Sequence, residues 1–140
     1  MYATEQDLIE LAGKDEILMI ADRDNDDIAD PDVISAALSY ADNTVNGYLA
    51  VRYKLPLTEV PDLVKTWAAS IARYRLHRDG APEHVVRDWK AALADLKDVA
   101  RGLIDLSIAD GSEPTTSSSG TVSVEGSEPV FSKDKLGGWL

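Results

Sequence analysis

The 140-residue chain contains no cysteine. This absence excludes a disulfide framework, a thiolate zinc site and a cysteine nucleophile, and it fits a protein made in a reducing cytoplasm. No apolar run approaches the roughly 20 residues that a membrane span needs. The first residues also lack the basic stretch followed by an apolar one that a secretory signal requires. We therefore expect a soluble, intracellular protein with no membrane association.

Recognisable catalytic motifs are missing as well. The sequence has no glycine-rich phosphate loop, no nucleophile elbow and no acid/base pair on a defined frame. We therefore expect that the chain is not an enzyme and that it needs no cofactor.

The net charge of −11 is unevenly distributed. Residues 1–30 carry ten acids and two bases, residues 31–109 carry ten of each, and residues 110–140 carry five acids and two bases. This balance argues against a surface that wraps nucleic acid, because phosphate binding needs net cations at the contact. A passage through which DNA slides without sticking remains compatible with it.

Helix signals dominate the first part of the chain. Thr4 is a candidate N-cap, with Asp7 as the acid of a capping box. A second short helix is expected from Asp15 to Ala21, and Asp30 followed by Pro31 is typical of the start of a long helix. Steps of three and four give that helix one apolar face. The face comprises Ile34, Ala37, Leu38, Ala41, Val45, Tyr48 and Leu49.

Two further long helices follow a connector over residues 52–60, where Leu55-Pro56-Leu57 cannot continue a helix. We expect one to begin at Pro61 and end at Asp79-Gly80, and the next to begin at Pro82. The apolar face of the first comprises Val64, Trp67, Ala68, Ile71 and Tyr74. The second has a heptad pattern, typical of a seam between helices, made of Val86, Trp89, Leu93, Leu96, Ala100 and Leu103. The sequence thus predicts an all-α fold, a small bundle of about three long helices plus short N-terminal helices.

The composition changes after Ile108. Residues 109–128 are rich in Ser, Thr and Gly with almost no apolar residue to bury, which is typical of a flexible arm. Large apolar side chains return near the end. They are Val130, Phe131, Leu136 and Trp139. We expect a helical domain over residues 1–108 and an extended arm over 109–140 whose apolar end docks on a partner subunit. Folding back onto its own helices is the alternative.

Several short motifs occur in a characteristic order. They are Met1-Tyr2-Ala3-Thr4, Asp22-Arg23-Asp24, Val45-Asn46-Gly47-Tyr48-Leu49, Arg52-Tyr53, Leu55-Pro56-Leu57, Ile71-Ala72-Arg73-Tyr74-Arg75-Leu76 and Val130-Phe131-Ser132-Lys133-Asp134. Together they resemble the Mu-type bacteriophage head–tail connector or neck protein family, a phage domain of unknown function, from residue 1 to about residue 136. The chain departs from the family's pattern at Asn46, where an acid is usual, and at Asn25 and Asp27, where glycine is frequent.

The resemblance implies a structural virion protein, a head–tail connector (adaptor or head-completion) subunit that forms a ring under the portal and links capsid to tail. The implied location is the virion neck, with assembly in the host bacterial cytoplasm. The implied partners are copies of itself, in a ring expected to be dodecameric, the portal protein, and a tail-side neck or terminator protein. DNA would pass through the channel without sequence recognition. A small calcium- or partner-binding helical adaptor is the alternative.

The acidic loop before the first long helix resembles the first half of a calcium loop, with oxygens at positions 1, 3, 5 and 9. The weak candidate metal ligands are Asp22, Asp24, Asp26 and Asp30. Position 6, where the turn requires glycine, is Asp27, and position 12, where a bidentate glutamate belongs, is Val33. The simpler interpretation is an acidic turn whose charges are favourable near a helix N-terminus.

Basic side chains gather around the turn between the last two helices. They are Arg73, Arg75, Arg78, Arg87 and Lys90. We expect the four arginines to contact the portal or the acidic N-terminal region of a neighbouring subunit; ordinary solvated charge and contact with DNA stay open. His77 and His84 lack the spacing of a metal pair.

Overall fold

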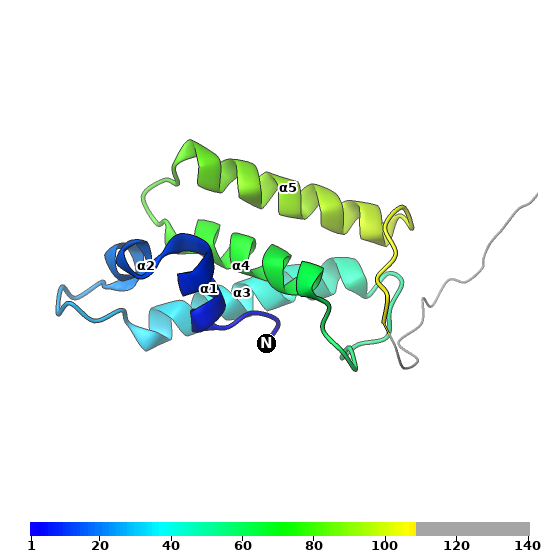
Figure 1. Ribbon diagram of the computed structural model, residues 1–140, viewed down its shortest axis with the longest axis horizontal. Helices are drawn as coiled ribbons and strands as arrows, with labels where there is room; N and C mark the ends of the chain where they lie inside the picture. Colours follow the sequence, from blue (N-terminus) through cyan, green and yellow to red (C-terminus); the bar gives the residue numbers. More distant parts are fainter. Residues whose placement is uncertain (109–140) are drawn as a thin grey trace, which may run out of the picture.

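The computed structural model of the chain describes residues 1–108 and consists of five helices, with no strand in this range. They are α1 (Glu5–Ala12), α2 (Lys14–Ala21), α3 (Pro31–Leu49), α4 (Asp62–Leu76) and α5 (Glu83–Ala100) (Figure 1). The all-α prediction of three long helices and two short N-terminal ones is confirmed. The predicted contact residues Val130, Phe131, Leu136 and Trp139 lie outside the described residues.

The two short helices form a small hairpin at one end of the bundle (Figure 1). The predicted capping box is present, because the Asp7 amide donates to the Thr4 hydroxyl and the Asp7 carboxylate accepts from the Thr4 amide. Gly13, at φ 92°, separates α1 from α2. Ahead of α1, the Tyr2 amide donates to Asp42 on α3 at 2.9 Å, which fixes the start of the chain against the bundle.

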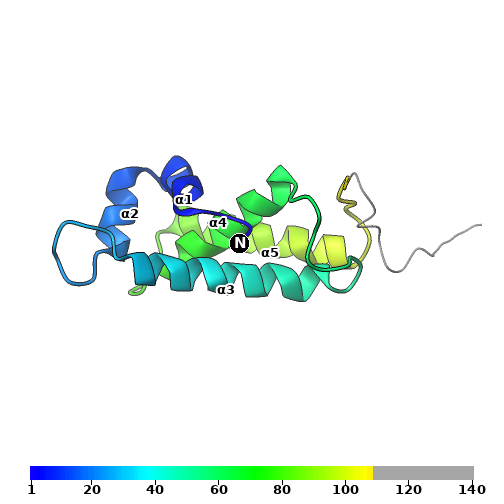
Figure 2. The ribbon, with the colours of Figure 1, turned by 90° about the horizontal axis from the view of Figure 1, so that it is seen from below.

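Helix α3 runs along the length of the bundle (Figure 2). Its predicted apolar face is buried except for Tyr48, which is half-buried. Asp30 holds the N-cap position as predicted, but its side chain does not cap the helix. The Asp30 carboxylate accepts instead from the backbone amide of Arg23, at 2.9 Å, and so closes the acidic loop.

Helix α4 is the centre of the fold, since it packs against α1, α3 and α5. Seven consecutive residues, from Trp67 to Arg73, are buried, so every side of this stretch faces protein. The sequence predicted burial along one face of α4, and the buried surface of this helix is wider than that face. Alanines 68, 69 and 72 allow the neighbouring helices to approach closely, as small side chains do. A helix buried all round is typical of a core element.

Helix α5 differs from the prediction in register and length. Its buried residues are Val85, Ala92, Leu96 and Val99, whereas Leu103 lies beyond the helix and is 67% exposed. The heptad prediction was wrong at Leu103, because α5 ends at Ala100 and the chain turns at Gly102, with φ 84°. Leu106 takes the buried place instead.

Tyr53 holds the segment after α5 in place. Its hydroxyl accepts from the Leu106 amide at 2.9 Å and donates to the Asp105 carboxylate at 3.1 Å. The neighbouring Arg52 donates to the carbonyl oxygen of Val99 at 3.2 Å. The described part of the chain therefore ends, at Ile108, at the end of the bundle where α3 and α5 stop.

The opposite end of the bundle carries the starts of α3 and α5, the end of α4 and the α1–α2 hairpin (Figures 1 and 2). The molecule thus has two chemically different ends. Within residues 1–108, no helix combines the length and the apolar character that crossing a membrane requires.

Candidate functional site

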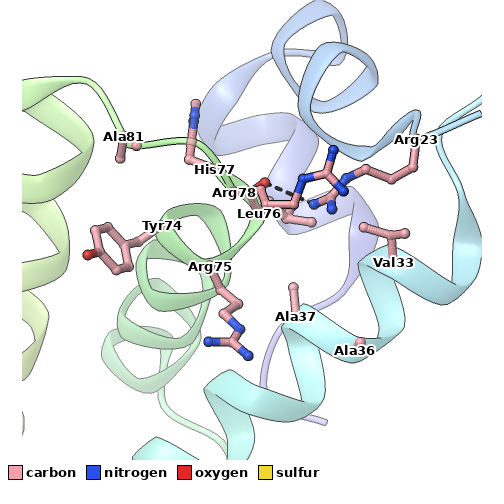
Figure 3. Close-up of a pocket in the computed structure, with 11 residues that line it drawn as sticks. Arg23, Val33, Ala36, Ala37, Tyr74, Arg75, Leu76, His77, Arg78 and Ala81 are labelled. Carbon is pink, nitrogen blue, oxygen red and sulfur yellow. Dashed lines mark hydrogen bonds between the residues drawn. The ribbon is translucent and has the colours of Figure 1, made fainter. Parts of the chain in front are cut away.

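A groove of about 720 Å³ opens at the end where α4 stops, against the first turns of α3 (Figure 3). Its apolar surface comes from Val33, Ala36, Ala37, Leu76 and Ala81. Three arginines line it, Arg23, Arg75 and Arg78, together with Tyr74, His77 and Gly80. We call this set the cationic groove.

Arg23 reaches the groove from the acidic loop (Figure 3). Its guanidinium donates to the carbonyl oxygens of Leu76 and Ile20, each at 3.2 Å. These carbonyls accept hydrogen bonds but carry no full negative charge. Arg23 therefore ties the loop to the end of α4 and leaves its charge uncompensated by a carboxylate.

Arg75 and Arg78 are both exposed. The Arg75 guanidinium lies over the Tyr40 ring, 4.4 Å from its centroid, a cation–π contact that holds the side chain across from α3. Within residues 1–108, no carboxylate forms an ion pair with Arg23, Arg75 or Arg78.

The other four of the seven arginines each have a carboxylate partner in the same range. The pairs are Arg52–Asp105 at 3.4 Å, Arg73–Glu16 at 2.6 Å, Arg87–Asp88 at 3.4 Å and Arg101–Asp98 at 3.8 Å. The arginines without such a partner are thus the three that line the cationic groove. A chain with 25 acids and 14 bases could have paired them, so their grouping is a distinctive feature of this surface.

Arg73 is placed differently from the other predicted contact arginines. It is 6% exposed, and its guanidinium binds Glu16 on α2 through two hydrogen bonds, Nε–Oε2 at 2.6 Å and Nη2–Oε1 at 2.8 Å. The hydrogen bond from Arg73 lowers the pKa of Glu16, and the same bond raises the pKa of Arg73. In this fold the acidic N-terminal region thus meets Arg73 within one chain, and the contact of Arg73 with the portal or a neighbouring subunit stays a prediction.

Arg87 does not line the groove, and its side chain is 73% exposed on α5. The structure thus brings two of the four predicted arginines together, Arg75 and Arg78, and adds Arg23. Sequence reasoning placed Arg23 in the acidic loop and missed its part in the groove. The available signal was a single base among five aspartates from Asp22 to Asp30.

The groove wall is fixed by the packing of α4 on α5. Tyr74 stacks on Trp89 with ring centroids 4.0 Å apart and planes 4° from parallel. His77 faces Glu16, with Nε2 3.4 Å from Oε2. The groove therefore sits on helices whose relative position is set by side-chain contacts.

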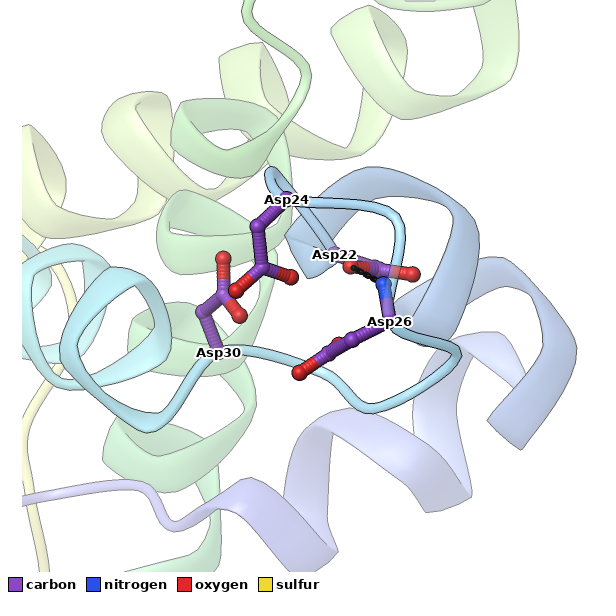
Figure 4. Close-up of side chains that lie close together, drawn as sticks. All are labelled: Asp22, Asp24, Asp26 and Asp30. Carbon is purple, nitrogen blue, oxygen red and sulfur yellow. Dashed lines mark hydrogen bonds between the residues drawn. The ribbon is translucent and has the colours of Figure 1, made fainter.

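The acidic loop gathers the four predicted aspartates (Figure 4). One carboxylate oxygen from each of Asp22, Asp24, Asp26 and Asp30 lies within 4.8 Å of the others. Asp27, at the position where a calcium loop needs glycine, adopts φ 64°, and Asn25 adopts φ 61°. The loop therefore takes left-handed conformations at these positions without glycine.

The closely spaced carboxylates of this loop alter the pKa of Asp24. The pKa of Asp24 is raised to about 6, first by a side-chain hydrogen bond with Asp26 and then by desolvation and the nearby Asp22. Asp22 accepts from the amides of Asp26 and Asp27, and Val33 offers no oxygen at the twelfth position. Exposed acids often cluster without a metal, so the geometry does not by itself assign a cation.

Residues 1–108 thus form a small all-helical domain with a cationic groove at one end. A family model described as Bacteriophage Mu, Gp36 matches residues 2–125, and the chain belongs to this bacteriophage family. It is 31% identical over 107 residues to the Mu-like prophage FluMu protein gp36 of Haemophilus influenzae, over 76% of this chain and 75% of that protein. It is 28% identical over 137 residues to Gene product J of Escherichia phage Mu, over 97% of each. The family resemblance is thereby confirmed, and the chain is a phage protein.

Proposed function

We propose that this chain is a structural virion protein, a head–tail connector subunit that assembles as a ring under the portal and links capsid to tail. Its partners in this proposal are copies of itself, the portal protein and a tail-side neck or terminator protein. Membership of the Mu Gp36 family supports a role in a phage particle. The observation that carries the connector role is the polarity of the described domain, with the cationic groove at one end and its last residue, Ile108, at the other.

A ring requires a heterologous contact, in which two different surfaces of neighbouring subunits meet. A subunit with chemically distinct ends supplies such surfaces. The groove lies between the start of α3 and the end of α4, and the segment after α5 packs on Tyr53 at the other end. Repeating one contact between unlike surfaces closes a ring when the rotation per subunit divides the circle, and the dodecamer expected from portal-associated rings is one such closure.

The charge distribution suits a channel for DNA. Residues 1–30 carry ten acids and two bases, and the arginines of residues 1–108 that lie outside the groove are engaged by carboxylates. A channel wall with a net negative charge, such as residues 1–30 would provide, binds phosphate weakly, so packaged DNA could pass without being retained.

The groove also lacks the groups of a catalytic site. Its lining has no carboxylate, cysteine or serine, and His77 is turned toward Glu16. The side chains of this surface are mostly arginine and apolar groups, which suit binding. A role in assembly accords with these side chains.

Electron microscopy of the full chain mixed with the portal protein of the same phage tests the proposal. We expect a ring of added density on one face of the portal ring, absent from images of the portal alone. Mass spectrometry of purified phage particles should also detect the chain. Portal rings without added density, in the presence of excess chain, would contradict the connector role.

The competing hypothesis of a calcium-binding adaptor gives a different result. Calcium would then raise the melting temperature of the isolated chain, by an amount that grows with the logarithm of its concentration above the dissociation constant, because a ligand that binds only the folded state stabilises it. The connector role requires no such dependence. Melting curves with calcium and with chelator therefore separate the two hypotheses.

A further inference from the structure

Three guanidinium groups share the cationic groove without a carboxylate from residues 1–108. Like charges held in one groove repel one another, and the repulsion is relieved when an anion enters. We propose that the groove binds the stretch Glu125–Phe131 from the C-terminal segment of a neighbouring copy. This inference rests on the proposed function, since it names the contact between successive subunits of the ring.

The chemistry of the stretch matches the groove. It reads Glu-Gly-Ser-Glu-Pro-Val-Phe, two carboxylates followed by two large apolar side chains. Arg75 and Arg78 can form charge-assisted hydrogen bonds with Glu125 and Glu128. The apolar surface from Val33, Ala36, Ala37, Leu76 and Ala81 offers a place for Val130 and Phe131. The groove and the stretch therefore each combine charged groups with apolar groups, and their charges are of opposite sign.

Other acidic or apolar stretches of the chain fit less well. The stretch around Leu136 and Trp139 is preceded by Lys133 and Lys135, which the groove arginines would repel. The acidic loop lies beside the groove, and its carboxylates Asp22, Asp26 and Asp30 already accept backbone amides of the loop itself. Within residues 109–140, Glu125–Phe131 is the stretch in which two carboxylates precede two large apolar side chains, and Lys133 follows two residues after Phe131.

The proposed ring, in which unlike surfaces of successive subunits meet, assigns the contact to a neighbour. The groove and the point where the described chain leaves, after Ile108, lie at opposite ends of α3 (Figures 1 and 2). Helix α3 has 19 residues and is about 28 Å long at 1.5 Å per residue. In a head-to-tail arrangement the exit of one subunit lies beside the groove of the next. Residues 109–124 span up to about 55 Å when extended, which reaches the groove of a neighbour and also that of the same chain, so the doubly substituted chain described below separates the two.

Cysteine cross-linking in full chains tests the contact, because the natural sequence has no cysteine. One chain carries Ala36→Cys in the groove and a second carries Ser127→Cys. The two are mixed in the portal assembly described above and treated with a mild oxidant. We expect a disulfide-linked pair of chains. A matched chain with Ala91→Cys, an exposed alanine on α5, should give at least fivefold less cross-linked product.

Charge reversal gives an independent measurement. Arg75→Glu with Arg78→Glu should reduce the cross-link at least fivefold, and Glu125→Arg with Glu128→Arg in the partner chain should restore it. Lys65→Glu, at an exposed position of α4, is the control and should leave the yield unchanged. Circular dichroism melts establish that the reversed chains are folded. Loss of the cross-link without restoration by the second pair of changes would overturn the charge contact.

The outcomes separate this inference from the proposed function. Ring density on the portal without any cross-link between the Ala36→Cys chain and the Ser127→Cys chain overturns the groove contact and leaves the connector role standing. A disulfide that forms only within a doubly substituted chain, Ala36→Cys with Ser127→Cys, overturns the assignment to a neighbour. Portal rings without added density contradict the connector role itself.

Discussion

Arg73 on α4 and Glu16 on α2 form a two-point ion pair at the junction of the N-terminal hairpin and the central helix. The Nε–Oε2 distance is 2.6 Å and the Nη2–Oε1 distance is 2.8 Å. Asp88 on α5 lies 3.9 Å from the same guanidinium. Arg73 therefore links three helices through one buried charge, whereas Arg75 and Arg78 are exposed and have no carboxylate partner within residues 1–108.

Removing the carboxylate from this pair should destabilise the fold strongly. Glu16→Ala leaves a guanidinium that is 6% exposed without its main counter-charge, so we expect the free energy of unfolding to fall by about 3 kcal/mol. Urea denaturation followed by circular dichroism measures the change. Glu10→Ala, at an exposed position of α1, is the control and should change stability by less than about 0.5 kcal/mol.

Replacing both partners gives a second comparison. Glu16→Leu with Arg73→Met removes the charge and its partner together, so the double variant should be more stable than Glu16→Ala. If the double variant is as unstable as Glu16→Ala, the loss of side-chain packing, and not the uncompensated charge, causes the destabilisation.

The acidic loop predicts a pH dependence through Asp24. Because the folded pKa of Asp24, about 6, lies above its ordinary value of 3.8, its contribution to stability is fully present below about pH 3.8 and is lost as the pH rises through 6. Asp24→Asn imitates the protonated side chain. The variant should therefore raise the melting temperature more at pH 7.5 than at about pH 4.5.

Asp79→Asn is the matched control for this experiment, because Asp79 is an exposed aspartate outside the loop. Its effect on the melting temperature should be small and similar at both pH values. An increase for Asp24→Asn that is equal at the two pH values would contradict the raised pKa of Asp24.

The sequence predicted those parts of the fold that local chemistry determines. The Thr4–Asp7 capping box and the apolar face of α3 depend on residues a few positions apart, and both are observed. The register of α5 depends on where Gly102 turns the chain and on Leu106 reaching Tyr53, 53 residues away. Periodicity within one helix contains no information about such a contact, which explains the error at Leu103.

The same distinction applies to the site. A run of bases predicted a cationic surface near Arg75 and Arg78, and the structure places both in one groove. The burial of Arg73 depends on Glu16, 57 positions earlier, and the inclusion of Arg23 depends on how the loop folds over the end of α4. Contacts between residues far apart in the sequence decide which arginines lack a carboxylate partner, and composition alone does not reveal these contacts.

The central position of α4 predicts sensitivity to larger side chains. Ala72 is fully buried in a helix that packs against α1, α3 and α5, so Ala72→Leu should force the helices apart and lower the free energy of unfolding by about 1–3 kcal/mol. Ala91→Leu makes the same change at an exposed position of α5 and should have little effect. Equal urea midpoints for the two variants would contradict the close packing around α4.

The hydroxyl of Tyr53 provides the last test, since it fixes the point at which the chain leaves the bundle. Tyr53→Phe removes the acceptor for the Leu106 amide and the donor to Asp105. A buried amide without a partner costs about 1–3 kcal/mol, so we expect a loss of stability in this range. Hydrogen exchange at the Leu106 amide should also become faster.

The control for that exchange measurement is Tyr40→Phe, which removes the hydroxyl of an exposed tyrosine whose ring holds Arg75. The ring remains, so stability and exchange at Leu106 should stay unchanged. If Tyr53→Phe leaves exchange at Leu106 as slow as before, the hydroxyl does not anchor this segment. The exit of the chain would then be held by Arg52 and its bond to the Val99 carbonyl, and Arg52→Met would become the variant that releases it.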